Sequence, residues 1–182
     1  MIQFTPMNIK IELSSADFVF AGWGRVLVGI WRGRTTANAI RSATQLVGRY
    51  ARESEGALSL MTVVEKNAPA PPSDARVELA NFLRGGNGQV QRHGLVFEGE
   101  GIRAASIRAV VAGVAFFSRP EYPYRVFDSA GSAARFLAGG GPATGTIHQI
   151  VRVVNEARRQ LAPRTIMPWP DSPSPVESLR PR

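Results

Sequence analysis

Hydrophobic and polar positions follow two different spacings along this chain, and together they predict alternating strands and helices. Short runs of β-branched and apolar residues are typical of strands, and a weaker alternation near the N-terminus indicates an edge strand or an N-terminal arm. Longer segments repeat apolar residues every three or four positions, as one face of a helix does. The predicted strands cover residues 9–13, 18–21, 26–31, 58–64, 90–98 and 124–127, and the predicted helices cover 35–54, 73–84, 102–118, 129–137 and 146–161.

This order of elements predicts the fold class. Two consecutive strands flank the turn at Gly22, Trp23 and Gly24, and each later strand follows a helix. Strands separated by helices are joined by right-handed crossovers and become parallel neighbours in one sheet. We therefore expect an α/β domain with a mixed, mostly parallel sheet of four or five strands. The helix at 102–118 is apolar nearly all round, so the rest of the protein should cover it well.

Prolines and glycines divide the chain into segments. Three prolines within 68–72 end the preceding strand because proline lacks the N–H group that a sheet needs. Three glycines at 139–141 interrupt the regular pattern, and six of the thirteen prolines lie beyond residue 162. The predicted segments are an N-terminal arm or edge strand (1–17), a main domain (18–138), a glycine-rich linker (139–145), a C-terminal amphipathic helix (146–162) and a proline-rich tail (163–182).

Composition narrows the classes of function. The 182 residues include no cysteine and only two histidines, His93 and His148, each without a partner nearby in the sequence. No motif indicates a nucleophile, a general base or a metal site. We therefore expect a protein that is not an enzyme and uses no cofactor or metal. No apolar run is long enough to span a membrane, and the first residues do not resemble a signal peptide, so we also expect a cytoplasmic location.

Several short motifs resemble one family. They are the runs Arg25–Gly33, Glu98–Ala105 and Tyr122–Phe127, together with Arg76 after the proline loop and a closing alanine-rich helix. In this order they are similar to SpoIIAA-like proteins of the STAS superfamily, over residues 18–138. The resemblance implies a STAS-like fold and a non-catalytic protein-interaction module. The best-known members are anti-sigma-factor antagonists, switched by phosphorylation of a serine at the start of the helix after the third strand.

The position that matches this serine is Ser73. A phosphate there would meet free N–H groups and the positive end of the helix dipole. The family's Asp-Ser-Ser-Gly signature is replaced by Pro-Pro-Ser-Asp-Ala at 71–75, and Asp74 would repel a phosphate. Ser73 is therefore either a phosphorylation switch or an ordinary N-cap residue.

A glycine turn offers an alternative function, the sensing of a nucleotide or another small ligand. Gly99 and Gly101 lie between a predicted strand and a predicted helix, as in the dinucleotide fingerprint, and Asp128 follows the next strand. These three residues are the candidate nucleotide ligands. However, Glu98 and Glu100 flank the glycines and would repel a pyrophosphate, so the competing interpretation is a tight turn between strand and helix.

The formal net charge of +8 offers a second alternative, a nucleic-acid-associated protein. Trp23 and Trp31 would stack on bases, and three arginines at 25, 32 and 34 lie near them. The basic residues are otherwise scattered singly along the chain. This scatter makes nucleic acid the less favoured partner.

The C-terminal segments are the candidate contact surfaces. The apolar stripe of the helix would cover its own sheet, pack on a second copy or bind a partner. In the tail, apolar residues among prolines resemble a short recognition segment. The candidate interaction residues are Ile147, Ile150, Val151, Val154 and Leu161 in the helix and Ile166, Met167 and Trp169 in the tail. We therefore expect a regulatory or assembly module that binds protein partners or a second copy of itself.

Overall fold

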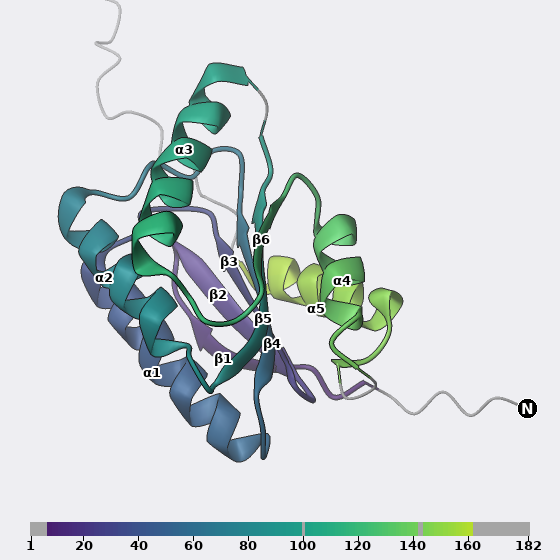
Figure 1. The fold of residues 1–182 in the computed structure, drawn as a ribbon. Coiled ribbons are helices and arrows are strands. Elements are labelled where there is room, and N and C mark those ends of the chain that lie inside the picture. Colours follow the sequence, from purple (N-terminus) through teal and green to yellow (C-terminus); the bar gives the residue numbers. More distant parts are fainter. Residues whose placement is uncertain (1–6, 100, 142–143, 162–182) are drawn as a thin grey trace, which may run out of the picture.

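Six strands form one sheet with helices on both faces (Figure 1). The computed structural model describes residues 7–99, 101–141 and 144–161. The strands are β1 (Lys10–Ser14), β2 (Phe18–Trp23), β3 (Val26–Trp31), β4 (Leu58–Val64), β5 (Val90–Phe97) and β6 (Tyr124–Phe127). The helices are α1 (Ala37–Glu53), α2 (Ser73–Gly85), α3 (Gly101–Ser118), α4 (Ala130–Ala138) and α5 (Ile147–Gln160).

The strands follow one another across the sheet in the order of the sequence. β1 and β3 each pair with β2 in an antiparallel sense, and β3 to β6 are parallel. The turn between β2 and β3 needs Gly24, whose φ of +54° lies in the left-handed region. The predicted α/β class and mostly parallel sheet are confirmed. The predicted four or five strands are too few, because the alternating segment near the N-terminus pairs with β2.

This sequential order decides where the helices lie. Right-handed crossovers that all advance in one direction pass over one face of the sheet, so α1, α2 and α3 form a single layer. The other face would be open to solvent without further elements. There α5 packs on β2 and β3, while α4 packs on β4, β5 and β6 (Figure 1).

Two apolar layers fill the space on either side of the sheet. Side chains that alternate along each strand point in turn toward α1 and α2 or toward α4 and α5. Fully buried members are Phe20, Leu27, Leu58, Leu60 and Leu83 in the first layer and Val19, Val26, Val28, Met61 and Ile150 in the second.

Helices α1 and α5 begin at threonine caps. The hydroxyl of Thr36 accepts a hydrogen bond from the Ala39 N–H at 3.2 Å. Thr146 and Gln149 form a capping box, in which each side chain accepts from the other residue's backbone N–H. These caps satisfy N–H groups that have no partner within the helix.

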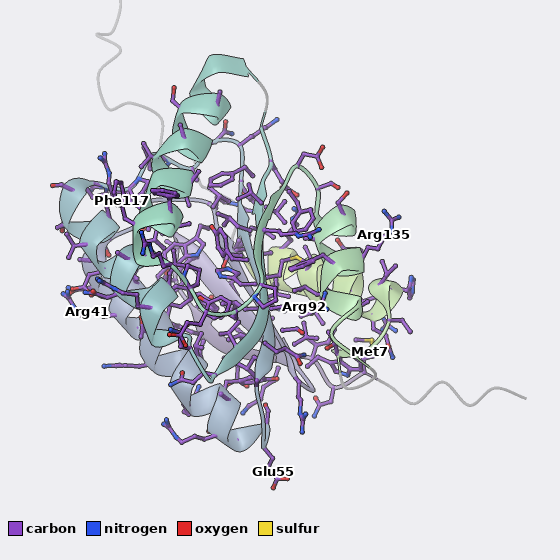
Figure 2. The ribbon with its side chains drawn as sticks, viewed as in Figure 1. Met7, Arg41, Glu55, Arg92, Phe117 and Arg135 are labelled. Atoms are coloured by element: carbon purple, nitrogen blue, oxygen red, sulfur yellow. The ribbon has the colours of Figure 1, made fainter. Side chains whose placement is uncertain are left out.

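Helix α3 is covered far less than its sequence predicts. Of its described side chains, only Val111, Ala115 and Ser118 are buried, whereas Phe116 is 72% exposed and Phe117 82% exposed. Phe117 lies on the side of α3 away from the sheet (Figure 2). The expectation that the rest of the protein covers this helix is therefore wrong, because α3 packs chiefly against α2 at one end of the helix layer. No helix within the described residues is both long enough and apolar enough to cross a membrane.

Candidate functional site

The carboxyl ends of β3, β4 and β5 form the edge of the sheet where open α/β sheets hold their ligands. Arg32 follows β3, and its Nε and Nη2 donate to the Glu65 carboxylate after β4 at 2.7 and 3.1 Å. This bidentate pairing raises the pKa of Arg32. Arg158 of α5 pairs in the same region with Glu98, which follows β5. A polar hollow of about 510 Å³ is lined by Arg32, Glu65, Lys66, Asn67 and Glu98.

A second, mostly apolar cavity lies between the sheet and the layer of α1, α2 and α3. Its volume is about 70 Å³, and most of its wall is aliphatic or aromatic. Its lining residues include three with polar side-chain atoms, Thr62 of β4, His93 of β5 and Tyr124 of β6. Thr35 and two prolines, from the loops after β3 and β4, also line it. The cavity therefore reaches toward the same carboxyl edge as the polar hollow.

The histidine in this cavity is paired at one ring nitrogen only. Leu60 pairs with His93 in the parallel register, so Thr62, two residues further along β4, presents its side chain on the same face. Nε2 of His93 lies 2.9 Å from Oγ1 of Thr62. Nδ1 is buried with no hydrogen-bond partner in the described part of the chain. Desolvation by burial lowers the pKa of His93 to about 3, so the ring is neutral at neutral pH.

Aromatic rings surround His93. The ring centroid of Tyr124 lies 5.1 Å from that of His93, and Phe82 and Tyr122 follow at 6.1 and 6.4 Å. Tyr122 Oη donates to the Leu83 carbonyl at 2.9 Å. Burial raises the pKa of both Tyr122 and Tyr124. The three ionisable groups are therefore neutral together, and they can position a ligand by hydrogen bonding more readily than they can move a proton.

The described residues do not indicate a metal-binding site. Within the described ranges, no three His, Asp or Glu side chains lie close enough together to hold a metal ion. Among the described residues, the Thr62 hydroxyl is the polar partner of His93, and a hydroxyl is a weak ligand beside carboxylates and imidazoles.

The glycine turn of the nucleotide interpretation connects β5 to α3. Gly101 has a φ of +80°, and a side chain there would meet nothing within 4 Å. The turn therefore needs this glycine for its backbone conformation. Asp128 is exposed just after β6, and because Val96 pairs with Phe127, Asp128 and Gly99 lie at the same edge of neighbouring strands. Glu100 lies outside the described residues.

Ser73 is the first residue of α2, and Pro72 occupies the N-cap position. The expectation that Ser73 is an N-cap residue is corrected, because a cap is extended and Ser73 is already helical. Its side chain is exposed, and Asp74 follows it in the first turn. Nearby, Arg76 Nε donates to the Pro71 carbonyl at 3.0 Å and so holds the proline loop. Phosphorylation of Ser73 stays a prediction.

The candidate contact residues of the C-terminal helix divide between core and surface. Ile150, Val154 and Leu161 are buried on the sheet, with exposed fractions of 0%, 1% and 3%. These three side chains therefore lie in the chain's own core. This is the alternative in which the helix covers its own sheet. Ile147 is 39% exposed and Val151 is half-buried. The candidates in the tail (Ile166, Met167 and Trp169) lie outside the described residues.

The residues of the nucleic-acid alternative are partly engaged within the chain. Trp31 is buried, and its ring centroid lies 4.8 Å from that of Phe18. Arg25 donates to the carbonyls of Ser54 and Glu55 at 3.3 and 3.0 Å. Trp31 therefore packs in the core, and Arg25 holds the C-terminal end of α1.

Sequence reasoning noted His93 as one of two histidines without a partner nearby in the sequence, but it did not select His93 as a site residue and it missed Thr62. Helices cover both faces of β4 and β5, so the runs LSLMTVV and VQRHGLVF show no clean alternation that would place Thr62 and His93 on the same face. Which strands become neighbours, and in which register, depends on the whole sheet. Comparison of this chain with protein-family models, curated proteins and solved structures found no match.

Proposed function

We propose that this protein is a non-catalytic interaction module that assembles with a second copy of itself through the outer face of α3. The observation that carries the proposal is the exposure of that face. Phe116 and Phe117 are 72% and 82% exposed, in the part of the helix, residues 109–118, that carries no charged side chain. A contiguous apolar surface of this kind is typical of an interaction site.

The face is suited to meeting its own copy. The chain carries a net charge of +8, so most surfaces of two copies repel each other, but residues 109–118 include no charged side chain. Ala109, Ala112 and Phe116 are exposed and Gly113 is half-buried, and their spacing places them on one face of the helix. Small residues leave space on the helix surface into which a large ring of a second helix can pack.

With a two-fold axis between Ala112 and Gly113, both copies would contribute the same surface to the contact. In an antiparallel pair of α3 helices around that axis, Phe116 of each copy would meet Ala109 of the other. Such a contact is isologous, as in most homodimers. The resemblance to SpoIIAA-like STAS domains, which are typically non-catalytic interaction modules, supports the same conclusion.

The test introduces opposite charges at the two positions that would face each other across the proposed axis. Light scattering coupled to size-exclusion chromatography measures the molecular mass of each variant. The wild type should have the mass of a dimer. Phe116→Lys and Ala109→Glu should each give a monomer, because each buries an unpaired charge in the interface. The double variant should recover the dimer, because the introduced lysine of one copy would then face the introduced glutamate of the other.

Ile147→Ser on α5 is the control, since it removes a partly exposed apolar side chain from the opposite layer. It should leave the dimer intact. A wild type that stays monomeric at high concentration, including one that binds lipid vesicles through α3 instead, would overturn the proposal. So would a dimer that survives both single substitutions.

A further inference from the structure

Strand β6 forms one edge of the sheet (Figure 1), and among the described residues it pairs only with β5. The His93 N–H donates to the Pro123 carbonyl at 2.9 Å. In a parallel ladder, the next residue of β6 that bonds to β5 is then Arg125, so the backbone groups of Tyr124 and Val126 point to the open side. Val126 is 41% exposed, and Arg125 is also exposed. These backbone groups can therefore pair with a further strand.

The opposite edge of the sheet, β1, is protected against such pairing. The register of β1 shifts between Ile11 and Leu13, and a bulge of this kind makes an edge strand irregular. Glu12 lies between them and pairs with Lys10 at 3.3 Å and with Arg49 at 3.0 Å. β6 shows no register shift against β5. Of the two edges, β6 is therefore the one whose geometry suits a further strand.

Two arginines beside this edge have no acidic partner in the described part of the chain. The guanidinium carbons of Arg92 on β5 and Arg125 on β6 lie 5.2 and 5.4 Å from the ring centroid of Phe136 on α4. This contact holds both cations on the α4 face of the sheet. Neither arginine forms an ion pair with a described residue, including Asp128, which follows β6. Positive charge without a described counterion therefore lies beside β6.

We propose that β6 binds an extended acidic segment of a partner protein, which adds to the sheet as a further strand. The backbone groups of Tyr124 and Val126 would hydrogen-bond to the segment and hold it extended. Side chains of the segment on the α4 face would lie beside Arg125, so aspartate or glutamate suits them. Side chains on the other face would lie beside Val126, so apolar residues suit those positions.

A second copy of this chain does not suit the same edge. Because β6 is only four residues long, two paired β6 strands would bring their Arg125 side chains close together. Like charges on facing strands destabilise the pair, and the net charge of +8 adds to the repulsion. The site uses no residue of α3, so it does not depend on the proposed self-association, and the mass of the protein and its binding of a peptide are separate measurements.

The test is an NMR titration of the isotope-labelled full chain with three capped hexapeptides. One alternates valine and glutamate, the second has lysine in place of glutamate, and the third is the acidic peptide with every backbone nitrogen methylated. The acidic peptide should bind saturably and should slow hydrogen exchange of the Tyr124 and Val126 amides at least tenfold at saturation. The Arg125 amide, which already bonds to β5, should change much less. The methylated peptide should bind at least tenfold more weakly, and the lysine peptide should not bind.

Variants of β6 separate the two parts of the recognition. Arg125→Glu should weaken the acidic peptide at least tenfold and should allow the lysine peptide to bind. Arg152→Glu, the same change at an exposed position on α5, is the matched control and should leave binding unchanged. Val126→Pro removes an N–H group that points away from β5, so the ladder with β5 stays intact while peptide binding should be lost.

Three outcomes would overturn the proposal. The first is an acidic peptide that does not bind the full chain. The second is equal binding of the methylated peptide, which would show that the arginines attract anions without strand pairing. The third is slowed exchange along β1 instead of β6. If Arg125→Glu or Val126→Pro does not fold, the exchange of the Tyr124 and Val126 amides in the wild type decides.

Discussion

Nε2 of His93 lies 2.9 Å from Oγ1 of Thr62, and this hydrogen bond joins the neighbouring parallel strands β4 and β5 on the face that α1, α2 and α3 cover. The second nitrogen of the ring has no protein partner among the described residues. A buried polar atom without a partner costs about 1–3 kcal/mol. The pair thus combines a hydrogen bond that supports the sheet with a buried nitrogen that makes no hydrogen bond to the described residues.

The first prediction concerns the stability of this pair. Replacing both residues, Thr62→Val with His93→Phe, should raise the free energy of unfolding by about 1–2 kcal/mol, because no polar atom is left unpaired. Thr62→Val alone should lower it by about 1–3 kcal/mol, because both ring nitrogens of His93 then lack a partner. Urea unfolding followed by circular dichroism measures both. A double variant that is less stable than Thr62→Val would contradict the prediction.

The second prediction is a pH dependence of stability that arises from His93. Its pKa is about 3 in the folded chain and 6.5 in the unfolded chain. As pH falls below 6.5, the unfolded state binds a proton that the folded state refuses, so stability is full above pH 6.5 and declines below it. By about pH 5 the loss should reach about 2 kcal/mol.

Unfolding of wild type and His93→Phe at a series of pH values measures this loss. The variant should show a smaller decline above about pH 5, where carboxylates still remain largely ionised. His148→Asn removes the other imidazole, from an exposed position, and serves as the control. Parallel pH profiles for the wild type and His93→Phe would show that His93 is not the titrating group.

The third prediction tests the role of α5 in covering the sheet. Ile150 is fully buried there, and Ile150→Ala should lower the free energy of unfolding by about 2–5 kcal/mol. Ile147, on the same helix, is 39% exposed, and Ile147→Ala should cost less than about 1 kcal/mol. Thermal melts of the two variants give the comparison. Equal effects would show that α5 does not pack as described.

A chain that ends at Gly139 extends this test. It retains every strand and the helices α1 to α4, but it exposes the apolar face of β2 and β3 that α5 covers. We expect aggregation or the loss of a cooperative melt, because a large apolar area returns to water at roughly 25 cal/mol per Å². A soluble, cooperatively melting short chain would instead assign α5 to an interface.

The fourth prediction compares two ion pairs of different burial. Arg32→Lys replaces the two-pronged contact with Glu65 by a single one and should cost about 1 kcal/mol, since both side chains are less than one quarter exposed. Arg41→Lys changes a pair with Glu78 in which the arginine is 51% exposed, and it should cost less than about 0.5 kcal/mol. Urea unfolding at low and high salt checks the order.

The elements themselves were determined by the local sequence. Alternation within each strand, the caps at Thr36 and Thr146, and Gly24 in the hairpin turn all act between residues that are close in the chain. Such signals depend on backbone geometry and side-chain spacing, so they can be read before any fold is known. The same signals showed that Ile150 and Val154 share the apolar face of one helix.

What that face covers was decided only by the tertiary structure. Once the strands take a sequential order, every crossover helix lies on one side, so the other side needs α4 and α5, while α3 at the end of its layer stays largely uncovered. The register of β4 and β5 likewise brought Thr62 to His93. These relationships join residues far apart in the chain, and no local spacing specifies them, because they follow from how all six strands pack together.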